Sequence, residues 1–412
     1  MAKKAFEQSL RLTQFFLLLS GIKITKTKFR KSFERFLDYY LYYITQSWLY
    51  TDVCGELNWL VEGILSGKSF IDLSLTAPCI TISMLATSKS IFLYLNRDII
   101  VKVVDKLRDI HPEDDDFDEE TITEVNTVKI FNYEQTDEEK EIVKESIKFL
   151  NFVVRLQYYI CGVVIFAFPL MPVTSMAYDY YMTGTTEYKY PYLVKYFFDV
   201  YNMKMWPAVY FHHVASTAIV GAAVFGSDSL FYTVCIYIQM HFRTLCLRCE
   251  RIVTSSAKET RENLAKAVKR HQELIDLVDQ VEILYSKSTL FNIVTSSFLI
   301  CLSGFIITVL EDISVVVTFA TFLFMNLSQI SLLCYFGDML MRSSTEVSSA
   351  VYNSLWYETD ERTKKSMLVI LMRAQKPCKL TACNFADLNL TAFTTILSRS
   401  WSYFALLKTM YK

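Results

Sequence analysis

Net charge is almost absent from this 412-residue chain, because its 42 lysines and arginines are balanced by 43 aspartates and glutamates, for a formal charge of -1. Nucleic-acid-binding proteins use a basic surface to neutralise phosphates, and no such excess exists here. The sequence therefore predicts no nucleic-acid partner, and its charges are informative only through their positions along the chain.

The sequence also lacks the short motifs that build active sites. It contains no G-x-S-x-G elbow, no P-loop and no H-E-x-x-H zinc motif. Its five histidines are scattered at His111, His212, His213, His241 and His271. Because catalysis requires several such groups to converge, we predict that the protein is not an enzyme and uses no cofactor.

A cysteine framework, a metal motif and internal repeats are missing too. The ten cysteines fall mostly within apolar stretches, which is not the pattern of a disulfide-stapled secreted domain. Cys246 and Cys249 form one C-x-x-C, but a zinc site needs a second ligand pair and none stands nearby. The paired half-repeats with glycine-broken helices that are typical of transporters are likewise absent.

What the chain has in abundance is apolar side chains, since 52% of its residues are hydrophobic and 15% are aromatic. A helix that crosses a bilayer needs about 20 mostly apolar residues, because only a helix pairs all its backbone polar groups within one segment. Seven stretches meet this requirement, namely 36–65, 70–95, 149–173, 206–240, 290–310, 313–336 and 388–407. The predicted fold class is an all-α membrane protein with seven transmembrane helices.

The first of these spans contains three carboxylates, Asp38, Asp52 and Glu56. Charged side chains are costly in hydrocarbon and usually face protein or water when they occur in a span. We therefore expect these carboxylates to lie away from lipid.

Basic residues indicate the orientation, because short connections rich in lysine and arginine stay on the cytoplasmic side. They concentrate in the N-terminal tail and in three connections, 97–148, 241–287 and 342–379. They are few in the alternate connections, 62–69, 172–204 and 311–314. This alternation predicts a cytoplasmic N-terminus and an extracellular C-terminus. A seven-helix receptor that signals through a G protein, the alternative class, has the opposite polarity.

The segments outside the spans have their own patterns. Residues 1–24 lack a cleavage site and are flanked by basic residues, which predicts an uncleaved amphipathic segment on the cytoplasmic membrane surface. The acidic run 111–120 predicts a solvated loop, since it lacks the glycine and terminal glutamate of an EF-hand. The outer connection 179–190 predicts a loop, with a lid over a ligand pocket as the alternative.

Two cytoplasmic stretches, 258–283 and 344–371, have helical periodicity amid charged residues. They predict helices that continue beyond the bilayer. Such extensions can pack into an anchor that joins subunits, although solvated amphipathic helices are the simpler explanation of the pattern.

The last span, within 386–412, has hydroxyl side chains that recur three and four residues apart, at Thr391, Thr394, Thr395, Ser398 and Ser402. Residues at this spacing share one side of a helix, so several copies around an axis would line a wettable conduit for ions. Toward the outer end the helix becomes apolar, which suits a gate that closes by dewetting. Hydrogen bonding between helices explains the hydroxyls equally well.

Three motifs in the last seventy residues resemble the signature of the insect odorant receptor family: SSTEVSSAVYNSLWY at 343–357, RAQKP at 373–377 and SWSYFALL at 400–407. The resemblance implies a tetrameric, nonselective cation channel formed with a co-receptor subunit in the plasma membrane of a sensory neuron dendrite. The short connection between the fourth and fifth spans resembles an odorant-tuning subunit more than the co-receptor.

The resemblance also implies roles for parts of the chain. Residues 1–385 would form the receptor body, with ligand-binding spans in 36–342 and an anchor at about 343–385, and residues 386–412 would form the pore helix. The gate would consist of Leu406, Thr409 and Met410. Arg399 departs from a neutral pore stripe, and we expect it to turn toward a neighbouring helix. The anchor would include Tyr352, Trp356, Tyr357, Arg373 and Pro377.

In this family the odorant lies in the outer halves of the second, third, fourth and sixth spans. The corresponding residues here are Phe70, Leu73, Thr76, Ile80, Leu156, Ile160, Val164, Trp206, Tyr210, His213, Phe319 and Phe322. At about 25 cal/mol per Å² of buried apolar surface, a few hundred Å² suffices for roughly micromolar binding of a small volatile, whether odorant or pheromone. Each of these residues, His213 included, is by itself more typical of plain packing.

Overall fold

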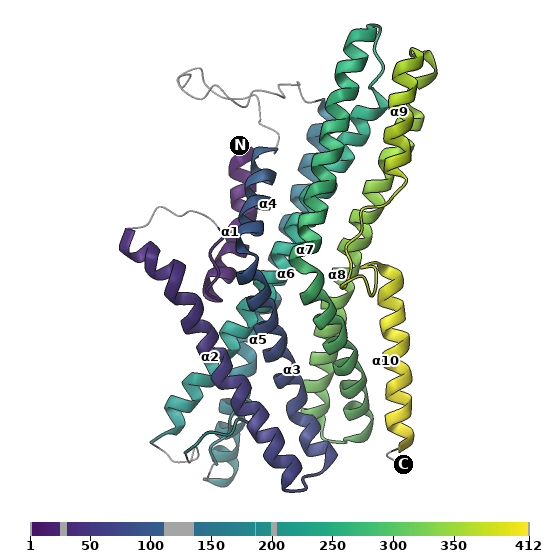
Figure 1. Cartoon of the computed structure of the whole chain (residues 1–412). Helices are drawn as coiled ribbons and strands as arrows, with labels where there is room; N and C mark the ends of the chain where they lie inside the picture. The colour runs from purple at the N-terminus through teal and green to yellow at the C-terminus, as the bar shows by residue number, and fades with distance from the viewer. Residues whose placement is uncertain (1, 25–30, 111–135, 186, 199–203, 411–412) are drawn as a thin grey trace.

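The computed structural model describes residues 2–24, 31–110, 136–185, 187–198 and 204–410. The acidic run 111–120, predicted as a solvated loop, lies outside these described residues. The described chain forms a long bundle of helices (Figure 1) whose predicted all-α class is confirmed. Its only strand-like pairing is an isolated bridge between Thr381 and Asp387.

The described helices are α1 (Ala2–Leu19), α2 (Lys31–Leu65), α3 (Phe70–Leu95), α4 (Arg97–Asp109), α5 (Asp137–Thr183), α6 (Trp206–Glu250), α7 (Ala257–Val309), α8 (Ile313–Asn353), the 3-10 turn η1 (Trp356–Glu358), α9 (Glu361–Ala374) and α10 (Leu390–Met410). The predicted span 70–95 coincides with α3. Several others begin or end well outside the predicted spans, because charged stretches continue the same helix beyond the apolar part.

Polar side chains set where several helices begin. The Ser69 hydroxyl accepts a hydrogen bond from the Asp72 amide at 3.1 Å at the start of α3. Thr136 and Ser256 cap α5 and α7 in the same way. Such caps satisfy amide groups that have no partner inside the first turn. At the other end of α5, Gly184 has φ 72°, a left-handed conformation that glycine adopts without a steric penalty.

Five of the described helices, α3, α5, α6, α7 and α8, are long and apolar enough to cross a membrane. The chain is therefore a multi-pass membrane protein. The two further predicted spans fall on α2, with its buried carboxylates, and on α10, with its hydroxyls. The number seven and the orientation stay predictions.

The helix α1 differs from its predicted place on the membrane surface. Its apolar face packs against α6, where Phe6 meets the ring of Tyr237 at 4.8 Å between centroids and the Ser9 hydroxyl lies 3.1 Å from the Tyr237 hydroxyl. A 3.6-residue period shows that one face of a helix is apolar but not whether lipid or protein covers it.

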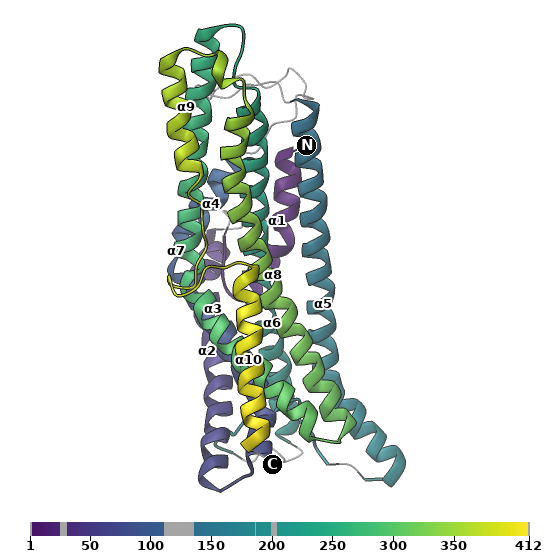
Figure 2. The same ribbon diagram turned by 90° about the vertical axis from the view of Figure 1, so that its right-hand side faces the viewer.

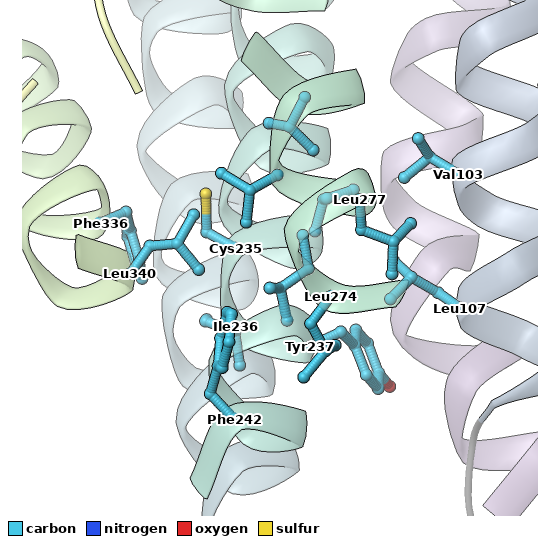
Figure 3. Packing of buried hydrophobic residues seen from close by; sticks show 14 of the residues in the cluster. Val103, Leu107, Cys235, Ile236, Tyr237, Phe242, Leu274, Leu277, Phe336 and Leu340 are labelled. Atoms are coloured by element: carbon cyan, nitrogen blue, oxygen red, sulfur yellow. The ribbon is translucent and has the colours of Figure 1, made fainter. Parts of the chain in front are cut away.

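The main core surrounds α6, whose residues from Gly226 to Phe242 are buried almost without interruption. Figure 3 shows side chains of α4, α6, α7 and α8 that meet there, among them Leu107, Phe242, Leu274 and Leu340. The core extends into the N-terminal half of α7, so the predicted helical extension 258–283 is confirmed. This core holds α6, α7 and α8 against one another.

Replacing Leu274 by alanine is expected to destabilise this core, because Leu274 is fully buried in the part of α7 that continues beyond the predicted span. A buried leucine-to-alanine change costs about 2–5 kcal/mol. Thermal unfolding of the detergent-solubilised protein measures the effect. The control is Ile283→Ala on the same helix, where the side chain is exposed; equal shifts for the two variants would contradict the described packing.

Candidate functional site

The helix α10 lies at the edge of the bundle, on the side away from α2 (Figure 1), and packs on α7 and α8 (Figure 2). Its covered side centres on the buried residues Ile396 and Ser400. At about 100° per residue, the exposed Thr391, Ser398 and Ser402 project from the opposite side. One flank of α10 is thus held by the subunit and the hydroxyl-bearing flank is free.

Several exposed hydroxyls of α10 donate to carbonyl groups within the helix. Thr395 donates to the Thr391 carbonyl at 2.9 Å, Ser402 to the Ser398 carbonyl at 3.0 Å and Thr409 to the Ala405 carbonyl at 2.9 Å. Because the hydrogen is used internally, each oxygen keeps lone pairs that point outward. Such oxygens can accept bonds from water or coordinate a cation.

The three residues predicted to form the gate lie on the exposed surface of α10. Leu406 and Met410 are 58% and 76% exposed, and Thr409 between them is exposed as well. Large apolar side chains exposed to this extent on one chain indicate a surface covered by lipid or by another subunit. Arg399 is also exposed in this chain, and its turn toward a neighbouring helix stays a prediction.

The segment 380–389, here called the strap, connects α9 to α10. The Leu388 amide donates to the Leu380 carbonyl at 2.7 Å, and Lys379 pairs with Asp387 at 2.6 Å. The Thr381 amide donates to the Glu282 carboxylate of α7 at 2.6 Å. The strap is therefore a closed turn fastened to α7, and it sets where α10 begins.

A glycine of α8 allows the strap to approach. A Cβ atom at Gly337 would lie 2.2 Å from the Leu388 carbonyl oxygen, much closer than any real contact. Backbone approaches backbone here, so even alanine would force one of them to move.

The predicted anchor residues lie near one end of the bundle. Tyr352, Trp356 and Tyr357 expose aromatic surface around η1, and Arg373 donates to the Lys376 carbonyl at 3.1 Å, just before the half-buried Pro377.

Arg373 also influences the interior of the anchor. Burial, followed by the positive charge of Arg373, lowers the pKa of His271 to about 4. His271 is therefore a neutral core histidine at physiological pH.

An aromatic row crosses the other end of the bundle, where the predicted pocket lies. Phe319 meets Phe322 at 6.4 Å, Phe322 meets Phe168 at 6.0 Å, Phe168 meets Tyr192 at 6.3 Å, and Tyr192 stacks on His213 at 4.3 Å between centroids. The row joins α8, α5, the segment 187–198 and α6. Three of its members were predicted, whereas Phe168 and Tyr192 were missed.

The other predicted pocket residues are distributed around this row. Phe70 packs edge to face on Phe305 at 5.9 Å, and Trp206 lies against Tyr210 at 4.9 Å. Thr76 and Ile80 are buried on α3, and Leu73 and Val164 are half-buried. Leu156 and Ile160 are exposed on α5. The structure thus brings part of the predicted set together, and the assignment stays a prediction.

Two carboxylates of α2 lie behind the row, buried in protein as we expected. Asp52 and Glu56 are each 1% exposed, and the Tyr192 hydroxyl donates to Asp52 at 3.0 Å. The Glu56 oxygens have no hydrogen-bond partner among the described residues. A third buried carboxylate, Asp228, pairs with Lys89 and accepts from Gln329 at 2.6 Å, which ties α6 to α3 and α8.

A cavity of about 270 Å³ opens beside these carboxylates, between the end of α2, the segment 187–198 and the start of α6. Its walls include Trp59, Glu62, Tyr190, Tyr192, Tyr196 and His213. Within the described part of the chain, no cluster of three His, Cys, Asp or Glu side chains could hold a metal ion. The walls of the cavity provide apolar and aromatic contacts and a few polar groups, which is typical of a small-molecule site.

The described chain is thus a multi-pass helical bundle with a polar helix at its edge and an aromatic cavity beside α2 and α6. The family model described as "7tm Odorant receptor" matches residues 69–400. This chain belongs to the odorant receptor family, as its motifs indicated, and is a receptor of olfaction rather than an enzyme.

Relatives and solved structures agree. The chain is 26% identical to Odorant receptor 67c of Drosophila melanogaster over 87% of this chain and 85% of that protein. It is 32% identical to Odorant receptor 85b of the same fly over 51% and 54% of the two chains. The insect olfactory receptor OR5 from Machilis hrabei, solved in complex with eugenol, superposes with a TM-score of 0.79 at 16% identity and covers both chains completely. The last comparison shows the shared fold.

Gly337→Ala is expected to shift the strap and the start of α10, because the new methyl group would overlap the Leu388 carbonyl. We expect the protein to reach the cell surface and odour-evoked current to fall by about tenfold or more. Gly162→Ala is the matched control, since a Cβ at Gly162 meets nothing within 4 Å. Current that is unchanged in Gly337→Ala would contradict the described contact.

Proposed function

We propose that this protein is the odorant-tuning subunit of an odorant-gated, nonselective cation channel, which it forms with a co-receptor in a tetramer at the dendritic plasma membrane of a sensory neuron. The main support is the free, hydroxyl-bearing flank of α10. Its oxygens point away from the body of the subunit, so a ring of such helices would have a wettable interior.

Gating in this proposal is a change in how α10 packs. In the closed state, Leu406 and Met410 of each subunit meet near the axis and exclude water, with Thr409 between them. In the open state, α10 tilts outward about its fastened end at the strap and withdraws both side chains. The covered flank of α10 is narrow, so a small repacking against α7 and α8 would suffice.

The ligand drives this change only through its differential affinity for the two states. A shift from 1% to 99% open requires a preference of roughly 10⁴-fold for the open state. In the predicted pocket, the aromatic row joins α5, α6 and α8, so the arrangement of its rings changes when these helices move relative to one another. An odorant that packs better on one arrangement of the row stabilises that arrangement.

The proposal is tested by recording odour-evoked current in cells that express this chain with and without a co-receptor. We expect inward cation current within the first second of odour application, in the presence of the co-receptor and with G-protein signalling blocked. A response that survives without the co-receptor and disappears on blocking G proteins would instead support the alternative class of receptor.

Leu406→Ser is expected to raise the resting current several-fold, because a hydroxyl at the constriction lowers the cost of wetting it. Whole-cell recording at zero odorant measures this, normalised to surface expression. Leu65→Ser replaces another exposed leucine, at the end of α2, and should leave the resting current as it is. Unchanged resting and evoked currents in Leu406→Ser would rule out this residue as part of the gate.

A further inference from the structure

The cavity beside α2 has a cover that is part of the fold. The Lys195 amide donates to the Gly55 carbonyl at 3.1 Å, and Lys195 also pairs with Glu62 near the end of α2. Gly55 lacks the Cβ atom that would otherwise lie 2.3 Å from the Val194 side chain. The segment 187–198 is therefore seated on α2, and the space of about 270 Å³ beneath it is a defined compartment.

His213 lines this compartment with unused hydrogen-bonding capacity. The residue is 1% exposed, and neither ring nitrogen has a hydrogen-bond partner among the residues that the structure describes. Leaving a buried donor and acceptor unpaired costs free energy, so such a group indicates a missing partner. The ring is fixed by stacking on Tyr192 and by Tyr190, whose centroid is 5.2 Å away.

The neighbouring histidine, His212, shows that unpaired ring nitrogens are not a general property of this end of α6. His212 lies 3.0 Å from the Thr51 hydroxyl through Nε2 and 2.9 Å from the Tyr196 hydroxyl through Nδ1. Both of its nitrogens are satisfied by the protein. His213, one residue later on α6, lines the cavity, and its ring nitrogens have no hydrogen-bond partner in the described part of the chain.

The groups around His213 determine what kind of partner fits. The Tyr192 hydroxyl donates its hydrogen bond to Asp52, so toward the cavity its oxygen can only accept a hydrogen bond. A neutral imidazole adds one donor and one acceptor.

We propose that this compartment binds a small odorant that carries a hydroxyl group, with the hydroxyl on His213 and the carbon skeleton against the tyrosine rings. A hydroxyl both donates and accepts, so it suits either tautomer of the imidazole. An ether or ester oxygen only accepts. The inference rests on the proposed function, and it names the chemical class of the ligand.

The size of the compartment agrees with a small ligand. Sites for drug-sized molecules occupy about 300–1,000 Å³. The space here lies just below that range. Aromatic walls bury an alkyl chain or a phenyl ring equally well, so the polar group rather than the skeleton distinguishes one ligand from another.

The test compares matched odorants on cells that express this chain with a co-receptor. Each set contains an alcohol, its methyl ether and the corresponding primary amine, on straight-chain skeletons of four to eight carbons and on phenylalkyl skeletons. For at least one skeleton, we expect the alcohol to reach its half-maximal response at a concentration about tenfold or more below that of the ether and the amine.

His213→Phe keeps an aromatic ring for stacking and removes both nitrogens. It should bring the alcohol and the ether to nearly equal potency while leaving the response to the ether intact. His213→Gln, which restores a donor and an acceptor, should recover part of the preference. His212→Phe is the matched control on the adjacent residue and should retain the preference of the wild type.

Several results would overturn the inference. They are a preference for the alcohol that survives in His213→Phe, potency that never favours the alcohol on any skeleton, and a larger response to the amine. If His213→Phe fails to reach the surface, Val209→Phe fills the cavity from another buried position on α6 and should abolish the alcohol response; an undiminished response would also overturn the inference. Absence of current to every odorant with the co-receptor present would instead refute the proposed channel function.

Discussion

The burial of α6 on all sides is the constraint on which the rest of the structure depends. The part of α6 from Gly226 to Phe242 is buried, so it needs packing partners on every side. The helices α1, α3, α5, α7 and α8 provide them. The same enclosure explains the pairing of Asp228 with Lys89 and Gln329, because a buried charge without a partner would be strongly destabilising. The interactions of Asp228 thereby fix α3 and α8 relative to α6.

Much of this fold could be predicted from the sequence. The span 70–95 needed only its apolar run, and the extension of α7 followed from helical periodicity amid charge. The turn of the strap depends on contacts between residues far apart in sequence, such as Thr381 with Glu282. No local pattern encodes such contacts.

The candidate site was less accessible to sequence reasoning. The family resemblance suggested which helices line a pocket, yet period alone does not decide which face of α5 turns inward, so Leu156 and Ile160 were included although they are exposed. Phe168 and Tyr192 were missed for the opposite reason. Tyr192 belongs to an irregular segment in which no periodicity exists, and only the lid considered for the neighbouring outer connection hinted that such residues could cover a pocket.

The way in which the strap is fastened has a consequence for how such receptors can diversify. Its contacts with Glu282 and Gly337 belong to α7 and α8, whereas most groups around the compartment belong to α2, α6 and the segment 187–198. Mutations that change the walls of the compartment can therefore accumulate in one part of the molecule while the contacts that seat α10 stay unchanged in another. A lineage of receptors with this architecture can change the odorants that it detects without changing how its last described helix is held.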